Sequence, residues 1–441
     1  MRSSDSSIAG LHARRVWDSR GNPTVEVEVA TESGEIGRAI APAGVSRGTR
    51  EAIDLRDGGD VLGGLGVGRA VLNVQKLIAP ELIGVDATDQ EAVDEAIIAL
   101  DHSALKARLG GNSTVAVSLA VMNAAAAAKG VPVWQHCAEL SGATPSLPLP
   151  EIQIFGGGAH AGRRVDIQDF MIMVPGASSF DEALEITSEV YRAAGSLMSQ
   201  KGALAGVADE GGWWPVFNHN EEALETLIRA IELAGEKPGD RVVISLDVAA
   251  SEFGSKGKYR LALEDRELGR EEMIRLLGRW IDDYAIASIE DPLAEDDKEG
   301  MRAFTQEFGR RVQIIGDDYL VTNTALLEEA ITDEACNAVL IKVNQVGTVS
   351  EALDCLKVAR KAGLGTIVSA RSGETEDVSI SHMAVGFGAQ QIKVGSFSRS
   401  ERMAKWNECL RIGDRIGQDT FVSGKPLAST DWARNIREGA C

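Results

Sequence analysis

Short apolar runs alternate with longer amphipathic stretches through the second half of the chain. The runs are rich in Val and Ile and lack polar alternation, which is typical of parallel strands buried on both faces. The stretches that separate them, such as EEMIRLLGRWIDDY and VSEALDCLKVARKAG, have the periodicity of helices that pack through one face. This alternation predicts an α/β fold of the (β/α) barrel type.

Five of the apolar runs end in an ionisable residue. The runs VVISLD, IASIE, VQIIGD, AVLIK and AQQIK end at Asp247, Glu290, Asp317, Lys342 and Lys393. Successive ends lie roughly 43, 27, 25 and 51 residues apart, where one unit of an eight-unit barrel takes about 30, so the longer steps leave room for an extra element or a skipped strand. The carboxyl ends of barrel strands meet on one face, so the five side chains are predicted to share a site. For any one of them alone, solvation of a strand end is an equal alternative.

The first part of the chain has a different pattern. PTVEVEVATESG alternates strictly from Thr24 to Val29, which predicts a half-solvated antiparallel strand with a turn at TESG. Helical segments follow, among them the Ala-rich TVAVSLAVMNAAAAAKG, and the loop SGATPSLPLP then leads into the barrel. We therefore predict an N-terminal α+β domain over residues 1–140 and a barrel domain over residues 141–441.

Composition narrows the classes of function. A chain of 441 residues suits two domains, and its net charge of −21 argues against nonspecific binding to nucleic acids or anionic membranes. No apolar run is long enough to span a membrane, and MRSSDSSIAGLHARR lacks the apolar centre of a secretory signal. The five cysteines are odd in number and form no CxxC pair, which favours a reducing compartment. We expect a cytoplasmic protein without nucleic-acid or membrane partners.

The residue types at the strand ends indicate metal-assisted proton chemistry. Asp247, Glu290 and Asp317 offer hard oxygen ligands, which suit Mg²⁺ rather than zinc. A lysine crowded by a divalent cation and a second lysine loses its proton more readily, so Lys342 or Lys393 can serve as a base next to a carboxylate. The alternative is that both lysines only pair with the carboxylates.

Three glycine-rich loops carry further candidates. Glu210 lies in DEGG, His160 lies in GGGAHAG, and Ser46 and Arg47 lie in APAGVSRGTREA, which resembles a lid that closes over a site. For each of these loops taken alone, a solvated turn is the simpler interpretation.

A fourth loop follows the apolar run GLGTIV. Its Arg371 and Ser372, together with Lys393, are predicted to clamp a phosphate or carboxylate, because arginine offers a planar fork of donors. The alternative is that Arg371 pairs with Glu374 or Glu376.

Taken together, the motifs resemble those of the enolases. They run in family order from about residue 10 to about residue 420: WDSRGNPTVEVEV, AGVSRG, GGGAHAG, DIQDFM, DEGG, SLDVAASEF, SIEDP, GDD, LIKVNQVGT, RSGETED and QIKVGSFSRSERMAKWNE. The resemblance implies an N-terminal capping domain, a modified (β/α)₈ TIM barrel and a homodimer or higher homo-oligomer.

The resemblance also implies site roles. It makes Asp247, Glu290 and Asp317 ligands of one Mg²⁺ and Ser46 a ligand of a second. It makes Lys342 the base that removes the C2 proton of 2-phosphoglycerate, and Glu210 the group that assists loss of the C3 hydroxyl to give phosphoenolpyruvate. The implied substrate-binding residues are His160, Asp169, Arg371, Ser372 and Lys393.

Departures from the enolase pattern gather in the same loops. Ala370 stands where enolases have a histidine, Arg47 replaces a threonine in the lid, and Asp169 is one methylene shorter than the usual glutamate. Further departures are Ala43, Val45, Gly156, Trp213 and Trp214. Space at Ala370 and a cation at Arg47 favour a substituent larger or more anionic than phosphate.

The leading hypothesis is therefore a diverged relative that acts on phosphorylated or phosphonylated carboxylic acids. It resembles carboxyphosphonoenolpyruvate synthase of phosphinothricin-type biosynthesis. The alternatives are a housekeeping enolase and a non-catalytic, enolase-like binding protein. The last is disfavoured because the metal trio, Lys342, Lys393 and Glu210 are all present.

Overall fold

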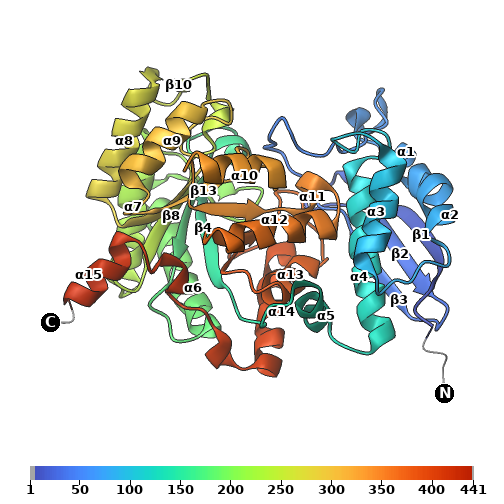
Figure 1. The fold of residues 1–441 in the computed structure, drawn as a ribbon. Coiled ribbons are helices and arrows are strands. Elements are labelled where there is room, and N and C mark those ends of the chain that lie inside the picture. The colour runs from blue at the N-terminus through green and yellow to red at the C-terminus, as the bar shows by residue number, and fades with distance from the viewer. Residues whose placement is uncertain (1–4, 440–441) are drawn as a thin grey trace.

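The computed structural model describes residues 5–439, which form a small N-terminal domain beside a large barrel (Figure 1). The N-terminal domain has an antiparallel sheet in the order β1-β2-β3 with helices against it. Its elements are β1 (Ile8–Trp17), β2 (Pro23–Thr31), β3 (Ile36–Ile40), η1 (Val61–Gly64), α1 (Gly68–Asn73), η2 (Val74–Ile78), α2 (Ala79–Leu82), α3 (Gln90–Asp101), α4 (Gly111–Lys129) and α5 (Val133–Ser141).

The strand predicted from Thr24 to Val29 lies in the middle of this sheet, but it is not half-solvated. Helix α4 packs against β2 and β3, and Thr24 and Glu26 are only 1% and 4% exposed. Arg14 on β1 reaches across to the carboxylates of Glu26 and Glu28, at 2.9 Å from Glu28. The prediction of a strand is therefore confirmed. The prediction that its polar face is exposed to solvent was wrong, because helix α4 covers the sheet and an arginine pairs with the acids.

The barrel contains eight strands in the closed order β4-β5-β8-β12-β13-β14-β15-β16, and β16 pairs with β4. They are β4 (Leu149–Gly156), β5 (Asp169–Met173), β8 (Val243–Asp247), β12 (Ile286–Glu290), β13 (Gln313–Gly316), β14 (Ala338–Ile341), β15 (Gly365–Ser369) and β16 (Gln391–Ser396). Strand β5 is antiparallel to both neighbours, so the barrel is a modified one and not wholly parallel as the apolar runs suggested.

Helices and smaller elements surround the barrel. The helices are η3 (Gly158–Ala161), α6 (Phe180–Lys201), α7 (Asn220–Leu233), η4 (Ala250–Glu252), α8 (Arg270–Asp283), α9 (Lys298–Phe308), α10 (Thr324–Thr332), α11 (Val343–Val346), α12 (Val349–Lys361), α13 (Ser379–Gly386), α14 (Ser400–Ile416), η5 (Gln418–Thr420), η6 (Lys425–Leu427) and α15 (Asp431–Gly439). The remaining strands are β6 (Leu204–Val207), β7 (Trp213–Pro215), β9 (Gly254–Ser255), β10 (Lys258–Leu261) and β11 (Arg266–Gly269).

These elements explain the uneven spacing of the strand ends. The small sheet β9–β11 lies between β8 and β12, which accounts for the long step from Asp247 to Glu290. Strand β15 lies between Lys342 and Lys393, which accounts for the other long step. The predicted extra element and skipped strand are both confirmed.

Helix α5 crosses the predicted domain boundary near residue 140 and packs against both α4 and α13. The boundary itself stays a prediction. Among the described residues, no single helix is long and apolar enough to span a membrane. Helices α4 and α5 together have the required length and apolar content, but they are bent by 104° relative to one another.

Candidate active site

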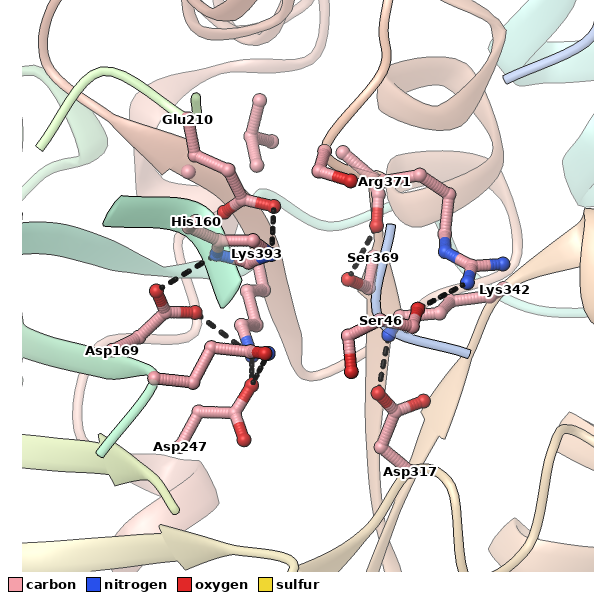
Figure 2. A pocket seen from close by; sticks show the side chains of 15 residues that line it. Ser46, His160, Asp169, Glu210, Asp247, Asp317, Lys342, Ser369, Arg371 and Lys393 are labelled. Carbon is pink, nitrogen blue, oxygen red and sulfur yellow. Dashed lines mark hydrogen bonds and ion pairs between the residues drawn. The ribbon is translucent and has the colours of Figure 1, made fainter. Parts of the chain in front are cut away.

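Most of the predicted site residues line a small cavity at the carboxyl ends of the barrel strands; Glu290 and Arg47 are not part of its lining. Figure 2 shows two groups of side chains that face each other across it: Asp169, Asp247, Glu210, His160 and Lys393 on one side, and Asp317, Lys342, Arg371, Ser369 and Ser46 on the other. Gln168, Ala370, Ser372, Val394 and Gly395 complete the lining.

The strand ends bring the charged residues together much as predicted. Asp247 and Glu290 are the last residues of β8 and β12, and Asp317 and Lys342 directly follow β13 and β14. Lys393 differs, because it is the third residue of β16, which runs on to Ser396. Its long side chain still reaches the cavity from this lower position.

Both lysines pair with the carboxylates. Lys393 Nζ lies 2.8 Å from Asp247 Oδ2 and 2.7 Å from Glu290 Oε2, and Lys342 Nζ donates to Asp317 Oδ2. Burial lowers the pKa of Lys342, but the charges of Asp317 and Glu290 raise it, and the net shift is upward. Burial also lowers the pKa of Lys393, but the charges of the neighbouring carboxylates, chiefly Asp247 and Glu290, raise it well above the ordinary value. The pairing with carboxylates that the alternative expected is therefore present, and it favours the charged form of both lysines.

The site holds oxygen atoms that suit a hard cation. Buried Glu290 Oε1 and Gln168 Oε1 have no hydrogen-bond partner among the described residues. Burial, and then the neighbouring charge of Asp247, raise the pKa of Glu290 well above its usual range. Unpaired oxygens with excess negative charge fit Mg²⁺.

The carboxylates group differently from the predicted trio. Oxygen atoms of Asp291, Asp317 and Asp318 lie within 4.8 Å of one another, whereas Lys393 bridges Asp247 and Glu290. Burial is the main cause that raises the pKa of Asp291 to about 8 and that of Asp318 well above normal.

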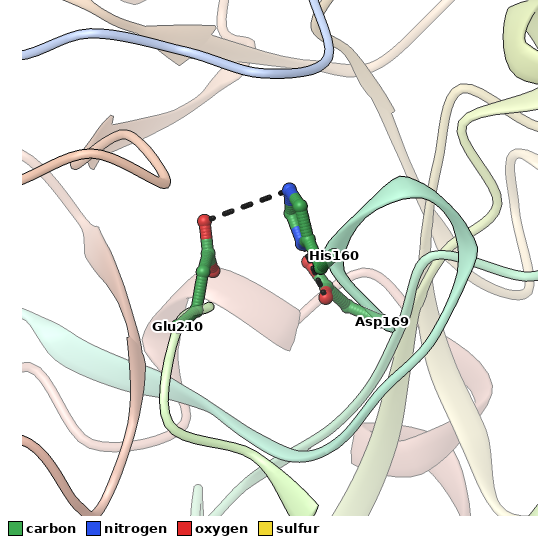
Figure 3. Close-up of side chains that lie close together, drawn as sticks. All are labelled: His160, Asp169 and Glu210. Carbon is green, nitrogen blue, oxygen red and sulfur yellow. Dashed lines mark hydrogen bonds and ion pairs between the residues drawn. The ribbon is translucent and has the colours of Figure 1, made fainter. Parts of the chain in front are cut away.

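His160, Asp169 and Glu210 form a second close group (Figure 3). His160 Nδ1 is 3.4 Å from Asp169 Oδ1, and its Nε2 is 4.0 Å from Glu210 Oε1. Burial lowers the pKa of His160, but the charges of Glu210 and Asp169 raise it to about 9. Gln153 connects Asp169 to the loop that carries Glu210, because it donates to Asp169 and accepts a hydrogen bond of 2.8 Å from the backbone N–H of Gly212. The imidazolium keeps the pKa of Glu210 low against the effect of burial.

The lid predicted at Ala41–Ala52 lies over the cavity. The Val45 N–H donates to Ser372 Oγ at 2.9 Å, and Arg371 Nη2 donates to the Ser46 carbonyl at 3.1 Å. Arg47 does not line the cavity: its Nη2 donates to the Ala52 carbonyl at 2.8 Å. The cation predicted for the phosphoryl end of the cavity is therefore turned toward the lid itself.

Arg371 pairs with an acid that the sequence did not suggest. Its Nη1 and Nη2 lie 2.9 and 3.1 Å from the two carboxylate oxygens of Glu51, and both side chains are almost fully buried. Glu374 instead accepts from the Arg371 backbone N–H at 3.0 Å. The alternative that the guanidinium pairs with Glu374 or Glu376 was wrong, because Glu51 reaches it from the other domain.

Two protein-family descriptions match the chain. "Enolase, N-terminal domain" matches residues 8–137, and "Enolase, C-terminal TIM barrel domain" matches residues 144–430. The chain belongs to the enolase family. It is therefore an enolase-superfamily enzyme of the Mg²⁺-dependent lyase type, whose acidic clusters could hold the metal.

Four residues of this enolase-family site were missed. Gln168 donates to Asp247 Oδ2 at 3.1 Å, and Glu252 accepts from Ser46 at 3.0 Å. Glu51 holds Arg371, and Arg402 donates to the carbonyls of Arg371 and Ser372. Gln168 and Glu252 lie inside the quoted motifs DIQDFM and SLDVAASEF, so only their neighbours had drawn attention. Glu51 and Arg402 likewise lie inside the quoted segments APAGVSRGTREA and QIKVGSFSRSERMAKWNE, but nothing in their spacing marked them as partners of Arg371.

Packing accounts for several departures from the enolase pattern. A Cβ at Gly156 would lie 2.5 Å from Ala208 Cβ, so a larger residue would force the strand outward. Trp213 stacks on Tyr191 with 4.6 Å between ring centres and donates to the Tyr191 carbonyl. Trp214 packs beside Gly162 in the His160 loop. Ala370 lines the cavity, where its methyl group occupies little space.

Proposed function

We propose that the enzyme removes the C2 proton of 2-phosphoglycerate with Lys342 and assists loss of the C3 hydroxyl with Glu210. The observation that carries the proposal is that these two side chains line one cavity from opposite sides. A base and an acid so arranged can act on adjacent carbons of one bound molecule.

Cations on the cavity wall suit an anionic substrate. Lys393 would hold the carboxylate, and Arg371 with Ser372 would hold the phosphoryl group, with His160 and Asp169 beside Glu210. Arg371 is held in one orientation, because its four Nη hydrogens are donated to Glu51, Asn344 and the Ser46 carbonyl; its positive charge and its Nε–H are what it can offer to the phosphoryl group. Closure of the lid excludes water, which strengthens these contacts.

Two Mg²⁺ ions are part of the proposal. Asp247, Glu290 and Asp317 would hold one ion and Ser46 the second, in keeping with the unpaired Glu290 oxygen. When bound, the ions would stabilise the charge that develops on the substrate carboxylate. Once Asp317 serves as a ligand, less of its charge is left for Lys342, which then gives up its proton more readily.

We further propose that the natural product is carboxyphosphonoenolpyruvate, a compound that carries a phosphonoformate unit where phosphoenolpyruvate carries phosphate. Ala370 supports this, because it places a small side chain in the cavity lining next to Arg371 in the chain. Arg47 lends no support in its present orientation. The second candidate is a housekeeping enolase, which is favoured by the complete set of charged residues around the cavity.

One assay separates these functions. Purified protein is given Mg²⁺ and 2-phosphoglycerate, and phosphoenolpyruvate is followed by absorbance, with a parallel phosphorus NMR run that contains phosphonoformate or its nucleotide-activated form. Rapid turnover of 2-phosphoglycerate alone supports the housekeeping function. A new phosphorus signal only with the phosphonate donor supports the synthase. K342A should abolish both reactions and the exchange of the C2 proton with solvent.

A further inference from the structure

Three loops from different parts of the chain meet at one carboxylate. Glu252, in the turn η4 after β8, accepts from the Ser46 hydroxyl at 3.0 Å through Oε1. Its other oxygen, Oε2, accepts from Arg163 Nη2 at 3.0 Å. Ser46 belongs to the lid and Arg163 to the loop that carries His160, so Glu252 joins both loops to the barrel.

The hydrogen bond from Ser46 fixes the direction of its hydroxyl. A serine hydroxyl has one hydrogen and two lone pairs, and here the hydrogen is given to Glu252. Ser46 also lines the cavity. The lone pairs are therefore left free for a ligand, and the negative charge of Glu252 makes the oxygen a better donor of electrons to a cation.

The side chain of Arg163 forms an ion pair with Glu252. Its side chain is 67% exposed, whereas that of Glu252 is 24% exposed. Its backbone is tied into the His160 loop by a hydrogen bond of 2.7 Å to the Gly158 carbonyl, and its φ of 57° is in the left-handed region. A long arginine that reaches out of a constrained loop turn to one carboxylate links that loop to the lid.

We propose that Glu252 is a positioning residue that orients the Ser46 hydroxyl toward a divalent cation, and that Arg163 anchors Glu252 in this position. The inference rests on the proposed function, which assigns a second Mg²⁺ to Ser46. It adds a coupling: the lid and the His160 loop move together, because both bind the same carboxylate. Cation binding at Ser46 and the placement of His160 are therefore linked.

Metal binding tests the orientation directly. Mn²⁺ is titrated into the protein, with and without 2-phosphoglycerate, and free Mn²⁺ is measured by its EPR signal. E252A should weaken the Ser46-dependent binding step by about 10-fold or more, the range for partners of metal ligands, and E252Q, which keeps an acceptor, should weaken it less. In S46A the step should be lost, and adding E252A should have no further effect.

Three outcomes would overturn the inference. The first is that E252A binds Mn²⁺ as tightly as wild type, and the second is that E252A weakens binding equally in wild type and in S46A. The third is that S46A gives the same Mn²⁺ titration curve as wild type. E189Q is the matched control, because Glu189 forms a similar exposed pair with Arg192 on α6 and should bind Mn²⁺ like wild type.

Hydrogen exchange tests the coupling. R163A should raise amide exchange in residues 41–52 as well as in residues 157–167, whereas R192A should change neither segment. Faster exchange confined to residues 157–167 would refute the coupling. Failure of the proposed function is seen separately, as absence of turnover in wild-type protein that still binds Mn²⁺ through Ser46 and Glu252.

Discussion

The ion pair between Glu51 and Arg371 offers a sharp test of how the lid and the barrel are held together. Both side chains are nearly inaccessible, at 1% and 2% exposure. Glu51 accepts two hydrogen bonds from the guanidinium, at 2.9 and 3.1 Å. In E51A the guanidinium keeps Asn344 Oδ1 and the Ser46 carbonyl as hydrogen-bond partners, and it loses its directly paired carboxylate, while Asp317 and Asp318 act on its charge only through space.

The magnitude follows from burial. Removing one partner of a buried pair typically costs about 3–5 kcal/mol, because the other charge stays desolvated. The neutral acceptors that remain to Arg371 place E51A near 3 kcal/mol. The matched control is E139A, since Glu139 pairs with Lys129 at 3.1 Å but is 45% exposed. Exposed pairs contribute about 0–1 kcal/mol.

The measurement is urea unfolding of wild type, E51A and E139A, followed by tryptophan fluorescence and by circular dichroism. A shift of the first transition that corresponds to about 3 kcal/mol in E51A, with an unchanged slope, is expected. A cost below about 1 kcal/mol, or equal shifts in E51A and E139A, would refute the reasoning, because burial would then not decide the strength of the pair.

Three further predictions concern single side chains. A370H adds an imidazole beside Arg371 and should raise 2-phosphoglycerate dehydration several-fold in a coupled absorbance assay; no gain would contradict a pocket adapted to a larger group. Burial raises the pKa of Asp94 to about 6, so the folded protein binds this proton more tightly than the unfolded chain, and stability should fall as pH rises from about 4 to about 6. D94N should remove that part of the slope in urea midpoints, and an unaltered slope would contradict it. The pKa of His160, raised to about 9 by Glu210 and Asp169 against burial, predicts an imidazolium at pH 8 in carbon NMR of the metal-free protein; a midpoint near its ordinary value would contradict this.

The barrel and most of the cavity were predictable from the sequence because both depend on local pattern. Buried strands are apolar, and a charge at the end of each run stands out against them, as for Asp247 and Glu290. The antiparallel direction of β5 was not predictable, since a five-residue buried strand has the same composition in either direction.

Contacts between distant segments were also beyond the sequence. Glu51 meets Arg371 across the two domains, and Glu252 meets Ser46, although nothing in the spacing of these residues marks them as partners. Arg47 looked like a substrate contact from its place in the lid, but the nearer carbonyl of Ala52 takes its donor.

The two buried lysines have different surroundings in the barrel interior. Side chains two residues apart on a strand share a face. The side chains beneath Lys342 are therefore apolar: Ala338 and Leu340 on β14 form a cluster with Ile315 on β13 and Ile367 on β15. The surroundings of Lys393 are polar instead. Gln391 lies beneath it on the same strand, and Glu151 on β4 is the register partner of Lys393.

This difference bears on the proposal that Lys342 is the base. Lys393 owes its raised pKa, against burial, to four carboxylates, namely Asp247, Glu290, Asp169 and Glu151. Lys342 depends chiefly on Asp317, while burial, Arg371 and Lys393 all oppose its charge. Once Asp317 binds another cation, Lys342 loses most of what keeps it protonated, whereas Lys393 still has Glu151, which does not line the cavity. These surroundings are consistent with the proposed roles, in which Lys342 is the base and Lys393 holds the substrate carboxylate.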